Sequence, residues 1–555
     1  MRQTEGALEC RHCSLQEWII FVGLAVSLGV VSAFHEPWLN EAQAWQIARN
    51  ASIKDILFSI PHYEGHPSLW HLILCIPAKL GLPYEFSIKA ISNLIILIVG
   101  WLLIFKSPFP RAVRMLLPFH YFFFYQNGVV SRPYGLMALA LILIALSFRE
   151  RQKHYLKFTL GLAFLCTLSG YGIVLAGGIA MVWTFEILRE KKWDILRRSF
   201  WRDRRIHALG ALLFFAILII LQIMPAQNAY AFTIEKRHSV LYCLMYGLFA
   251  MLPDCTLFNL LGCEEMPAYA AMDPIQLIVA CVIGAILLFA IFLFSSAENR
   301  WYFFVPFLLF QGFSSVVYLT AHHIGIILFF AVSWLWLAWE DPGRGDIYIK
   351  LKNKVSLSEK DREVLGRVGR GAGMLLLVMP VFWTIGASYL EIQYDYYFSK
   401  DAAAFIREHS LDQLSFLAQF SSDKEPLNVN ALDANCNPVA LMPYFDQNFC
   451  LNLNRGRDDM AYSSHAVASA KESEEVLHFL KEQGPPEALI GNVNLERIYG
   501  DRALMQEYTP VYELSPHYVS IWKFMHVNTV SIQKQYIYVR RDLLEKYGLR
   551  DTFDN

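Results

Sequence analysis

Residues 274–294 read PIQLIVACVIGAILLFAIFLF and contain no charged side chain. About 20 consecutive apolar residues match the hydrocarbon core of a bilayer, so this stretch predicts a membrane-spanning helix. Ten further runs have the same character, and they lie at 18–34, 86–105, 112–127, 132–148, 156–169, 171–188, 207–223, 301–320, 323–339 and 373–391. The sequence therefore predicts an all-α polytopic membrane domain with about 11 to 13 spanning helices.

The overall composition supports this prediction. Hydrophobic residues make up 55% of the 555 residues and charged residues only 17%, whereas soluble domains average about 25% charged residues. The formal net charge of -1 gives no basic field of the kind that attracts nucleic acid. Cys10 and Cys13 form a C-x-x-C pair, but no second pair follows at zinc-ligand spacing. No cofactor is indicated, and a divalent metal remains open.

Loop charge predicts the topology. Segments 189–205 and 340–370 each hold eight Lys or Arg residues, and positive loops stay in the cytoplasm. Two smaller basic turns carry Lys106, Arg111 and Arg114, and Arg149, Arg151, Lys153 and Lys157. Alternating spans then place the opposite set outside the cytoplasm, namely the loop after Phe34, the turns at 131–134, 169–172 and 322–323, and everything after residue 391.

Two segments leave the topology open. Segment 66–82 is apolar enough to span, but a full crossing would break the alternation. Because Pro67, Pro77 and Lys79 make it a poor span, we favour a re-entrant or interfacial helix, the alternative being an error in another span. Segment 240–261, interrupted by Pro253, fits either an interfacial helix or another hairpin.

The first outer loop, residues 35–65, predicts two interfacial helices. Trp38, Ala42 and Trp45 recur at helical spacing, which suits aromatic side chains at headgroup depth. Ser52 then precedes a helical stripe that begins at Ile53, and Ser52 with Asp55 resembles a capping box.

From about residue 392 the pattern changes to that of a soluble domain. Alternating residues predict strands at 427–432, 488–490, 511–514, 519–522 and 536–539, with helices at 400–408 and 472–483. The sequence thus divides into a membrane domain over 1–391 and an extracytoplasmic α/β domain over 392–555. Cys436 and Cys450 would either form a disulfide there or remain two thiols.

Ionisable side chains at the membrane edge are costly, and therefore suggest function. A carboxylate of the first outer loop, shielded by aromatic rings and lipid, would suit a general base; the candidates are Glu36, Glu41 and Glu64. Arg132 opens an apolar run and has the planar donors of a phosphate clamp, or alternatively of a headgroup anchor. His322 and His323 would hold phosphate, transfer protons or bind a metal, and His62, His66 and His71 add further imidazoles.

The runs HEPWLNEAQAW (35–45) and EGHPSLW (64–70) resemble the first outer loop of GT-C fold glycosyltransferases, which include protein O-mannosyltransferases and aminoarabinose transferases. SRPY at 131–134 resembles their arginine-containing turn, and SGYG at 169–172 and His322-His323-x-Gly325 resemble later turns of bacterial members. The similarity covers roughly residues 18–340.

The resemblance implies inverting transfer of a sugar from a polyprenyl-phosphate donor to a glycan, lipid or protein acceptor outside a bacterial plasma membrane. Glu41 matches the second member of the family's acidic pair, but the first member is Asn40, and an amide cannot act as a base. The resemblance therefore assigns the base to Glu41 or Glu64, and the donor phosphate to Arg132, His322 and His323. The supporting residues would be Glu36, Asn40, His66, Tyr134 and Tyr171.

Two other functions fit the same sequence. A transporter of lipid-linked sugars would carry polar groups at mid-membrane and often inverted repeats, whereas the polar groups here gather at one predicted face. A non-catalytic scaffold of envelope assembly would use the soluble domain to bind another protein, and Asn40 favours that alternative.

Overall fold

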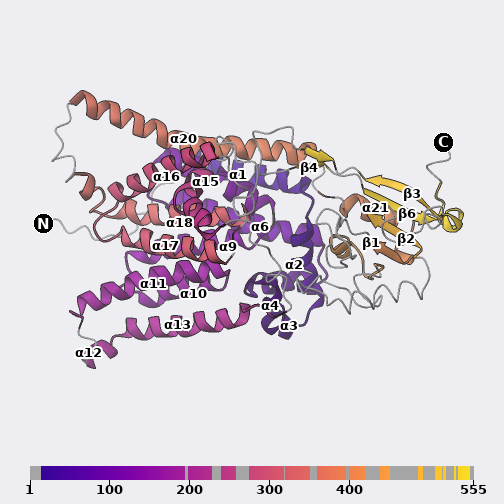
Figure 1. Cartoon of the computed structure of the whole chain (residues 1–555), viewed down its shortest axis with the longest axis horizontal. Helices are drawn as coiled ribbons and strands as arrows, with labels where there is room; N and C mark the ends of the chain where they lie inside the picture. The colour runs from indigo at the N-terminus through magenta and orange to yellow at the C-terminus, as the bar shows by residue number, and fades with distance from the viewer. Residues whose placement is uncertain are drawn as a thin grey trace.

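The computed structural model describes residues 14–193, 198–227, 239–257, 274–317, 319, 321–349, 359–394, 397, 399–418, 438–450, 486–491, 507–514, 517–519, 530–532 and 535–550. Figure 1 shows a bundle of long helices with a smaller sheet-containing domain at one end. Among the described residues, eight stretches of helix are long and apolar enough to cross a membrane. The chain therefore has the make-up of a multi-pass membrane protein.

Seven of the eight stretches coincide with predicted spans, and the eighth is the ambiguous segment after residue 239, in which three consecutive pieces form one 18-residue apolar helix. They are α1 (Leu15–Phe34), α6 (Tyr84–Trp101) continued by the π-helical turn η1 (Leu102–Lys106), α11 (Gly170–Glu190), α13 (Arg204–Ile223), α14 (Val240–Met245) with η5 (Tyr246–Ala250) and α15 (Met251–Leu257), α16 (Pro274–Phe294), α18 (Ala321–Glu340) and α20 (Glu359–Gln393).

The predicted number of 11 to 13 spanning helices is not reached in the described part of the chain. Three predicted spans form helices of only 15, 12 and 16 residues, which are α9 (Tyr134–Phe148), α10 (Tyr155–Cys166) and α17 (Trp301–Val316). The predicted span 112–127 is not one helix. It breaks into α7 (Arg111–Leu116), η2 (Leu117–Phe119), α8 (Tyr121–Phe124) and η3 (Tyr125–Val129).

This break has a local cause. Pro118 lies in η2 and has no backbone N–H to continue a helix. His120 follows in an extended conformation and starts α8, because its ring accepts a hydrogen bond from the N–H of Phe122. Hydropathy detects neither effect, so the run looked continuous.

The chain between α1 and α6 forms a layer of short helices at the end of the bundle that carries the sheet domain (Figure 1). They are α2 (Leu39–Asn50), α3 (Ile53–Phe58), α4 (Pro61–Glu64) and α5 (Leu69–Lys79). Helix α5 has 11 residues, a length of about 16 Å, which is half of a bilayer core. Lys79 and Cys75 bond to carbonyls at the end of α2, so α5 lies against α2, in agreement with the favoured interpretation of segment 66–82.

The prediction that α2 rests on the membrane surface is wrong. Residues 41–48 of α2 are all buried. Trp45, expected at headgroup depth, is 2% exposed and packs against the ring of Tyr84 at 5.5 Å. The aromatic spacing therefore marks a core-facing side of the helix, since α5, α6 and the C-terminal domain cover α2.

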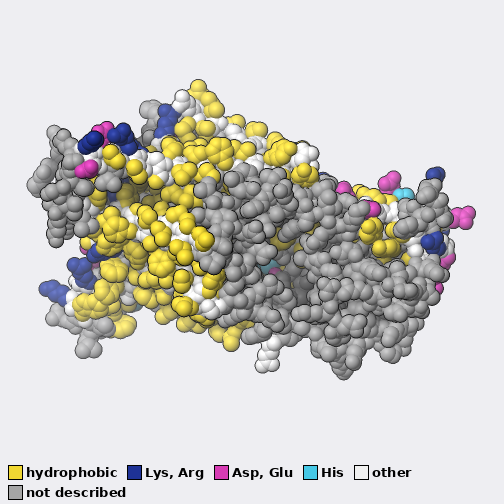
Figure 2. Space-filling view, turned by 45° about the horizontal axis from the view of Figure 1, so that its top comes forward, with side chains coloured by type: hydrophobic (Ala, Val, Ile, Leu, Met, Phe, Trp, Pro, Cys, Tyr) yellow, Lys and Arg dark blue, Asp and Glu magenta, His cyan; other side chains and the backbone are white. Residues whose placement is uncertain are grey.

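The basic turns gather at the opposite end of the bundle. Arg151 pairs with Glu186, and Arg205 with Glu190, which brings the turns after α9 and α11 together. Figure 2 shows Lys and Arg side chains at this end and a broad hydrophobic surface between it and the C-terminal domain. Not all the basic side chains of these turns are exposed: Arg114 is buried and bonds to Glu17 at 2.6 Å.

The C-terminal domain contains α21 (Ser399–Glu408) and a four-stranded sheet in the order β1-β2-β6-β3. Strand β1 is parallel to β2, and β6 is antiparallel to both of its neighbours. The strands are β1 (Phe416–Ala418), β2 (Ala488–Gly491), β3 (Tyr508–Leu514) and β6 (Gln535–Arg540), with a separate pair β4 (His517–Val519) and β5 (Val530–Ile532). The predicted helix 400–408 and strands 488–490, 511–514 and 536–539 are confirmed.

Other predictions for this domain lie outside the described residues. They are the strand 427–432, the helix 472–483, most of the strand 519–522, and the side chain of Cys436. The thiol of Cys450 is buried.

Arg49 at the end of α2 attaches this domain to the bundle. Its guanidinium donates to the carbonyl oxygens of Met442 at 3.0 Å, Phe445 at 3.2 Å and Pro443 at 3.4 Å. All three acceptors belong to the main chain. The hydroxyl of Tyr444 also donates to Glu85 at 2.8 Å.

Within the bundle, α11 and α17 approach closely at one glycine. A Cβ atom at Gly178 would lie 2.6 Å from the Cα atom of Pro306, whereas nothing lies within 4 Å of the same position at Gly177. The two glycines are neighbours on one helix, so they share nearly the same helical propensity cost.

We expect Gly178→Val to destabilise the folded protein by about 1–3 kcal/mol, because the added side chain forces two packed backbones apart. Gly177→Val is the matched control and should remain close to the native protein. Thermal unfolding of both variants in detergent measures the difference, and equal melting temperatures would contradict the close approach.

Candidate functional site

The loop between α1 and α2 contacts several other elements at the end of the bundle that carries the C-terminal domain. Helix α1 ends at Phe34, and His35 follows in an extended conformation. Pro37 continues the extended chain, and α2 starts at Leu39. Three ionisable side chains, those of His35, Glu36 and Glu41, therefore lie within a few residues of each other in the sequence.

His35 lies between two carboxylates. Its Nε2 atom is 3.0 Å from Oε2 of Glu41, and its Nδ1 atom is 2.8 Å from Oε1 of Glu391 at the end of α20. All three side chains are fully buried. Burial by itself would lower the pKa of His35, but the two carboxylates raise it to about 10. His35 is therefore a buried imidazolium that donates to both neighbours.

Each carboxylate has further donors. Glu41 accepts the backbone N–H of Ser131 at 2.7 Å and that of Trp38 at 3.1 Å. Glu391 accepts the hydroxyl of Tyr125. Glu41 is thus enclosed and saturated with hydrogen bonds, which suits a structural anchor better than a group that exchanges protons with a substrate.

Arg132 follows Ser131 and is half-buried. Its guanidinium carbon lies 5.8 Å from the ring of Trp38 and 5.9 Å from the ring of Tyr134. Among the described residues it has no acidic partner, and its Nε atom is buried without a hydrogen bond, as is the hydroxyl of Ser131. A cation held between aromatic rings, with a buried N–H unused, is suited to binding an anion.

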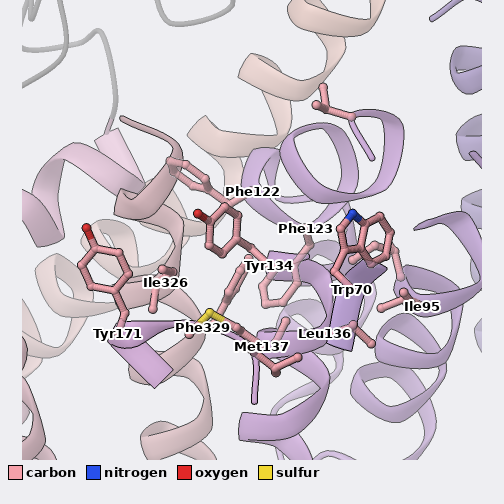
Figure 3. Packing of buried hydrophobic residues seen from close by; sticks show 14 of the residues in the cluster. Trp70, Ile95, Phe122, Phe123, Tyr134, Leu136, Met137, Tyr171, Ile326 and Phe329 are labelled. Carbon is pink, nitrogen blue, oxygen red and sulfur yellow. The ribbon is translucent and has the colours of Figure 1, made fainter. Parts of the chain in front are cut away.

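A second set of polar side chains lies next to Arg132. The hydroxyl of Tyr134 is 2.7 Å from Nε2 of His323 and 3.5 Å from Nε2 of His66. The ring of Tyr171 packs against His323 at 4.7 Å. Figure 3 shows Tyr134 in the middle of the apolar cluster, beside Phe122, and Tyr171 at its margin, near Ile326. The side chain of His322 lies outside the described residues.

Glu64 is the more accessible of the two candidate bases. Its side chain is half-buried, and its Oε1 atom accepts a hydrogen bond from the amide of Gln43 at 2.6 Å. Burial lowers the pKa of His71, and the nearby carboxylate of Glu64 opposes that shift. Glu64 and His66 flank Gly65, whose φ of 65° turns the chain after α4.

Glu36 and Asn40 have different surroundings. Glu36 accepts the backbone N–H groups of Tyr397 at 3.0 Å and Lys400 at 2.7 Å, so it caps the start of α21. Asn40 is half-buried, and its amide forms no hydrogen bond within the described part of the chain.

The structure brings most of the predicted residues together at one end of the bundle. Sequence reasoning missed Glu391 and Tyr125. The available signal was a single carboxylate at the outer end of the apolar run 373–391. No group of three potential metal ligands occurs in the described ranges.

Comparison of the chain with protein-family models, with curated proteins and with solved structures finds no match. The arguments for function therefore come from the site itself.

The raised pKa of His35 predicts how stability depends on pH. Below about 6.5 the imidazole is protonated in both the folded and the unfolded chain, and the full stabilisation is present. As pH rises toward the folded-state pKa of about 10, the unfolded chain loses its proton first, so this contribution declines. We expect the melting-temperature advantage of the native protein over His35→Gln to shrink between these values.

Melting curves in detergent from pH 6 to 10 measure this effect. The same substitution at His154, which is exposed at the opposite end, controls for loss of an imidazole. A difference between the native protein and His35→Gln that stays constant across the range would show that His35 is not held charged.

Proposed function

We propose that the protein is a glycosyltransferase of the GT-C type, which transfers a sugar from a polyprenyl-phosphate donor to an extracytoplasmic acceptor. The observation that carries the proposal is Arg132, a cation between Trp38 and Tyr134 that has no acidic partner among the described residues. Such a group at the end of an apolar bundle suits a phosphate whose lipid tail remains in the bilayer.

The surrounding side chains supply the remaining requirements. A developing phosphate charge needs donors, and His323 with Tyr134 lies beside Arg132. An attacking hydroxyl needs a base, and the geometry favours Glu64 over Glu41, because Glu41 is fully buried and bonded to Ser131, Trp38 and His35. The amide of Gln43 orients the Glu64 carboxylate.

The proposed reaction is a single displacement. The acceptor oxygen forms a bond to the anomeric carbon while the bond from that carbon to the phosphate oxygen breaks. The acceptor proton passes to Glu64, and the bonding electrons leave with the phosphate, whose charge Arg132 offsets. Attack from the side opposite the phosphate inverts the anomeric centre.

The positive-inside rule supports an outer location for this site. The paired basic turns lie at the opposite end of the bundle from the C-terminal domain (Figure 2). In the proposed orientation the domain therefore lies outside the cytoplasm, above the site, where it would meet a water-borne acceptor.

The proposal predicts that Arg132→Ala weakens binding of polyprenyl phosphate by about 10- to 100-fold, because charge-assisted hydrogen bonds to phosphate are lost. Polyprenyl alcohol, which lacks the phosphate, should bind the native protein and this variant equally. Arg149→Ala is the matched control, since Arg149 is exposed at the opposite end. Native mass spectrometry measures lipid binding by the purified native protein, Arg132→Ala and Arg149→Ala.

For the chemical step, Glu64→Gln should reduce sugar transfer or donor hydrolysis in proteoliposomes by about 10²–10⁴-fold, as expected for loss of a general base. Binding of polyprenyl phosphate should remain within about threefold of native. Native affinity in Arg132→Ala would reject the phosphate site. Specific binding without turnover of any polyprenyl-phosphate sugar would favour a transporter or a scaffold.

A further inference from the structure

We infer that Glu391 is a positioning residue, which holds Arg132 in place through His35, Glu41 and the backbone of Ser131. Glu391 lies on α20, the helix that leads into the C-terminal domain, and it was not among the residues expected from the sequence. The functional part of this inference rests on the proposed phosphate-binding role of Arg132.

The connection is a continuous series of short contacts. Glu391 Oε1 is 2.8 Å from His35 Nδ1, and His35 Nε2 is 3.0 Å from Glu41 Oε2. The other oxygen of Glu41 accepts the N–H of Ser131 at 2.7 Å. Ser131 directly precedes Arg132, so the last contact fixes the backbone from which the guanidinium extends.

Burial makes these contacts costly to break. The side chains of Glu391, His35 and Glu41 are fully buried, and Ser131 is 1% exposed. A charged group in such surroundings loses much free energy if its partner is withdrawn, because no water replaces the lost bond. The Ser131 turn therefore has one strongly favoured position as long as Glu391 is present.

Within the described ranges Arg132 has few other restraints. The rings of Trp38 and Tyr134 lie 5.8 and 5.9 Å from its guanidinium carbon, and rings restrict orientation only weakly. Backbone placement then decides where the guanidinium lies. Trp38 belongs to the same arrangement, since its N–H also donates to Glu41 at 3.1 Å.

The same loop also contacts the C-terminal domain. Glu36, next to His35, caps α21 through Tyr397 and Lys400. A shift of α20 or α21 would therefore act on the loop that holds Ser131. This arrangement makes Arg132 dependent on a residue more than 250 positions later in the chain.

The test uses amide hydrogen exchange, which requires no ligand. In Glu391→Ala the amide of Ser131 should exchange about tenfold faster than in the native protein, because its acceptor is no longer fixed. Polyprenyl phosphate should bind this variant about tenfold more weakly. Glu391→Gln keeps the shape and an acceptor for His35, so it should restore both values to within about twofold.

Thr384→Ala is the matched control on the same helix. The buried Thr384 hydroxyl donates to the carbonyls of Phe119 at 2.7 Å and Pro380 at 2.9 Å, neither of which belongs to the loop 35–41. This variant removes a different contact between α20 and the bundle, and it should leave exchange at Ser131 and phosphate binding close to native. If Glu391→Ala does not fold, Glu391→Asp withdraws the carboxylate and should give intermediate values.

The outcomes separate this inference from the proposed function. Unchanged exchange at Ser131 in Glu391→Ala would overturn it, as would faster exchange with unchanged phosphate affinity, or equal effects in Thr384→Ala. Failure of the native protein to bind polyprenyl phosphate would instead reject the proposed function, and exchange at Ser131 would still measure the structural connection.

Discussion

One buried cation, the imidazolium of His35 between Glu41 and Glu391, holds together the end of the bundle next to the C-terminal domain. A cation and two anions without access to water require every remaining donor and acceptor to be matched. The N–H groups of Ser131 and Trp38 and the hydroxyl of Tyr125 meet that requirement. Four separate parts of the chain are thereby fixed relative to each other, and the candidate site is built on them.

The apolar runs allowed the helical membrane domain to be predicted, because a bilayer imposes a length on each span that hydropathy detects. The same method failed at residues 112–127, where Pro118 and the cap at His120 divide the run. A different inference, from aromatic spacing, failed for α2. Trp38 and Trp45 have the spacing of an interfacial helix, and only the covering elements decide whether that face meets lipid or protein. Loop charge predicted correctly that the turns after α9 and α11 share an end.

For the candidate site, the sequence predicted which residues would lie together better than it predicted what each residue would contact. Arg132, Tyr134, His66 and His323 were expected in one place, and the structure brings them together. Glu36 was expected to support the site, but its contacts are with the start of α21. Glu391 could not be assigned, because one carboxylate at the end of an apolar run gives no indication of its partner, which is 356 residues away. Long-range pairing of this kind depends on tertiary structure.

The attachment of the C-terminal domain through Arg49 has a consequence for how this protein can diverge. Its three acceptors are carbonyl oxygens of residues 442, 443 and 445, which every amino acid possesses. Substitutions in that segment can therefore alter the face of the domain without releasing its hold on α2. For these three bonds selection acts on Arg49 alone, whereas the neighbouring bond from Tyr444 to Glu85 depends on both side chains. The domain can therefore vary its surface elsewhere as different molecules are encountered.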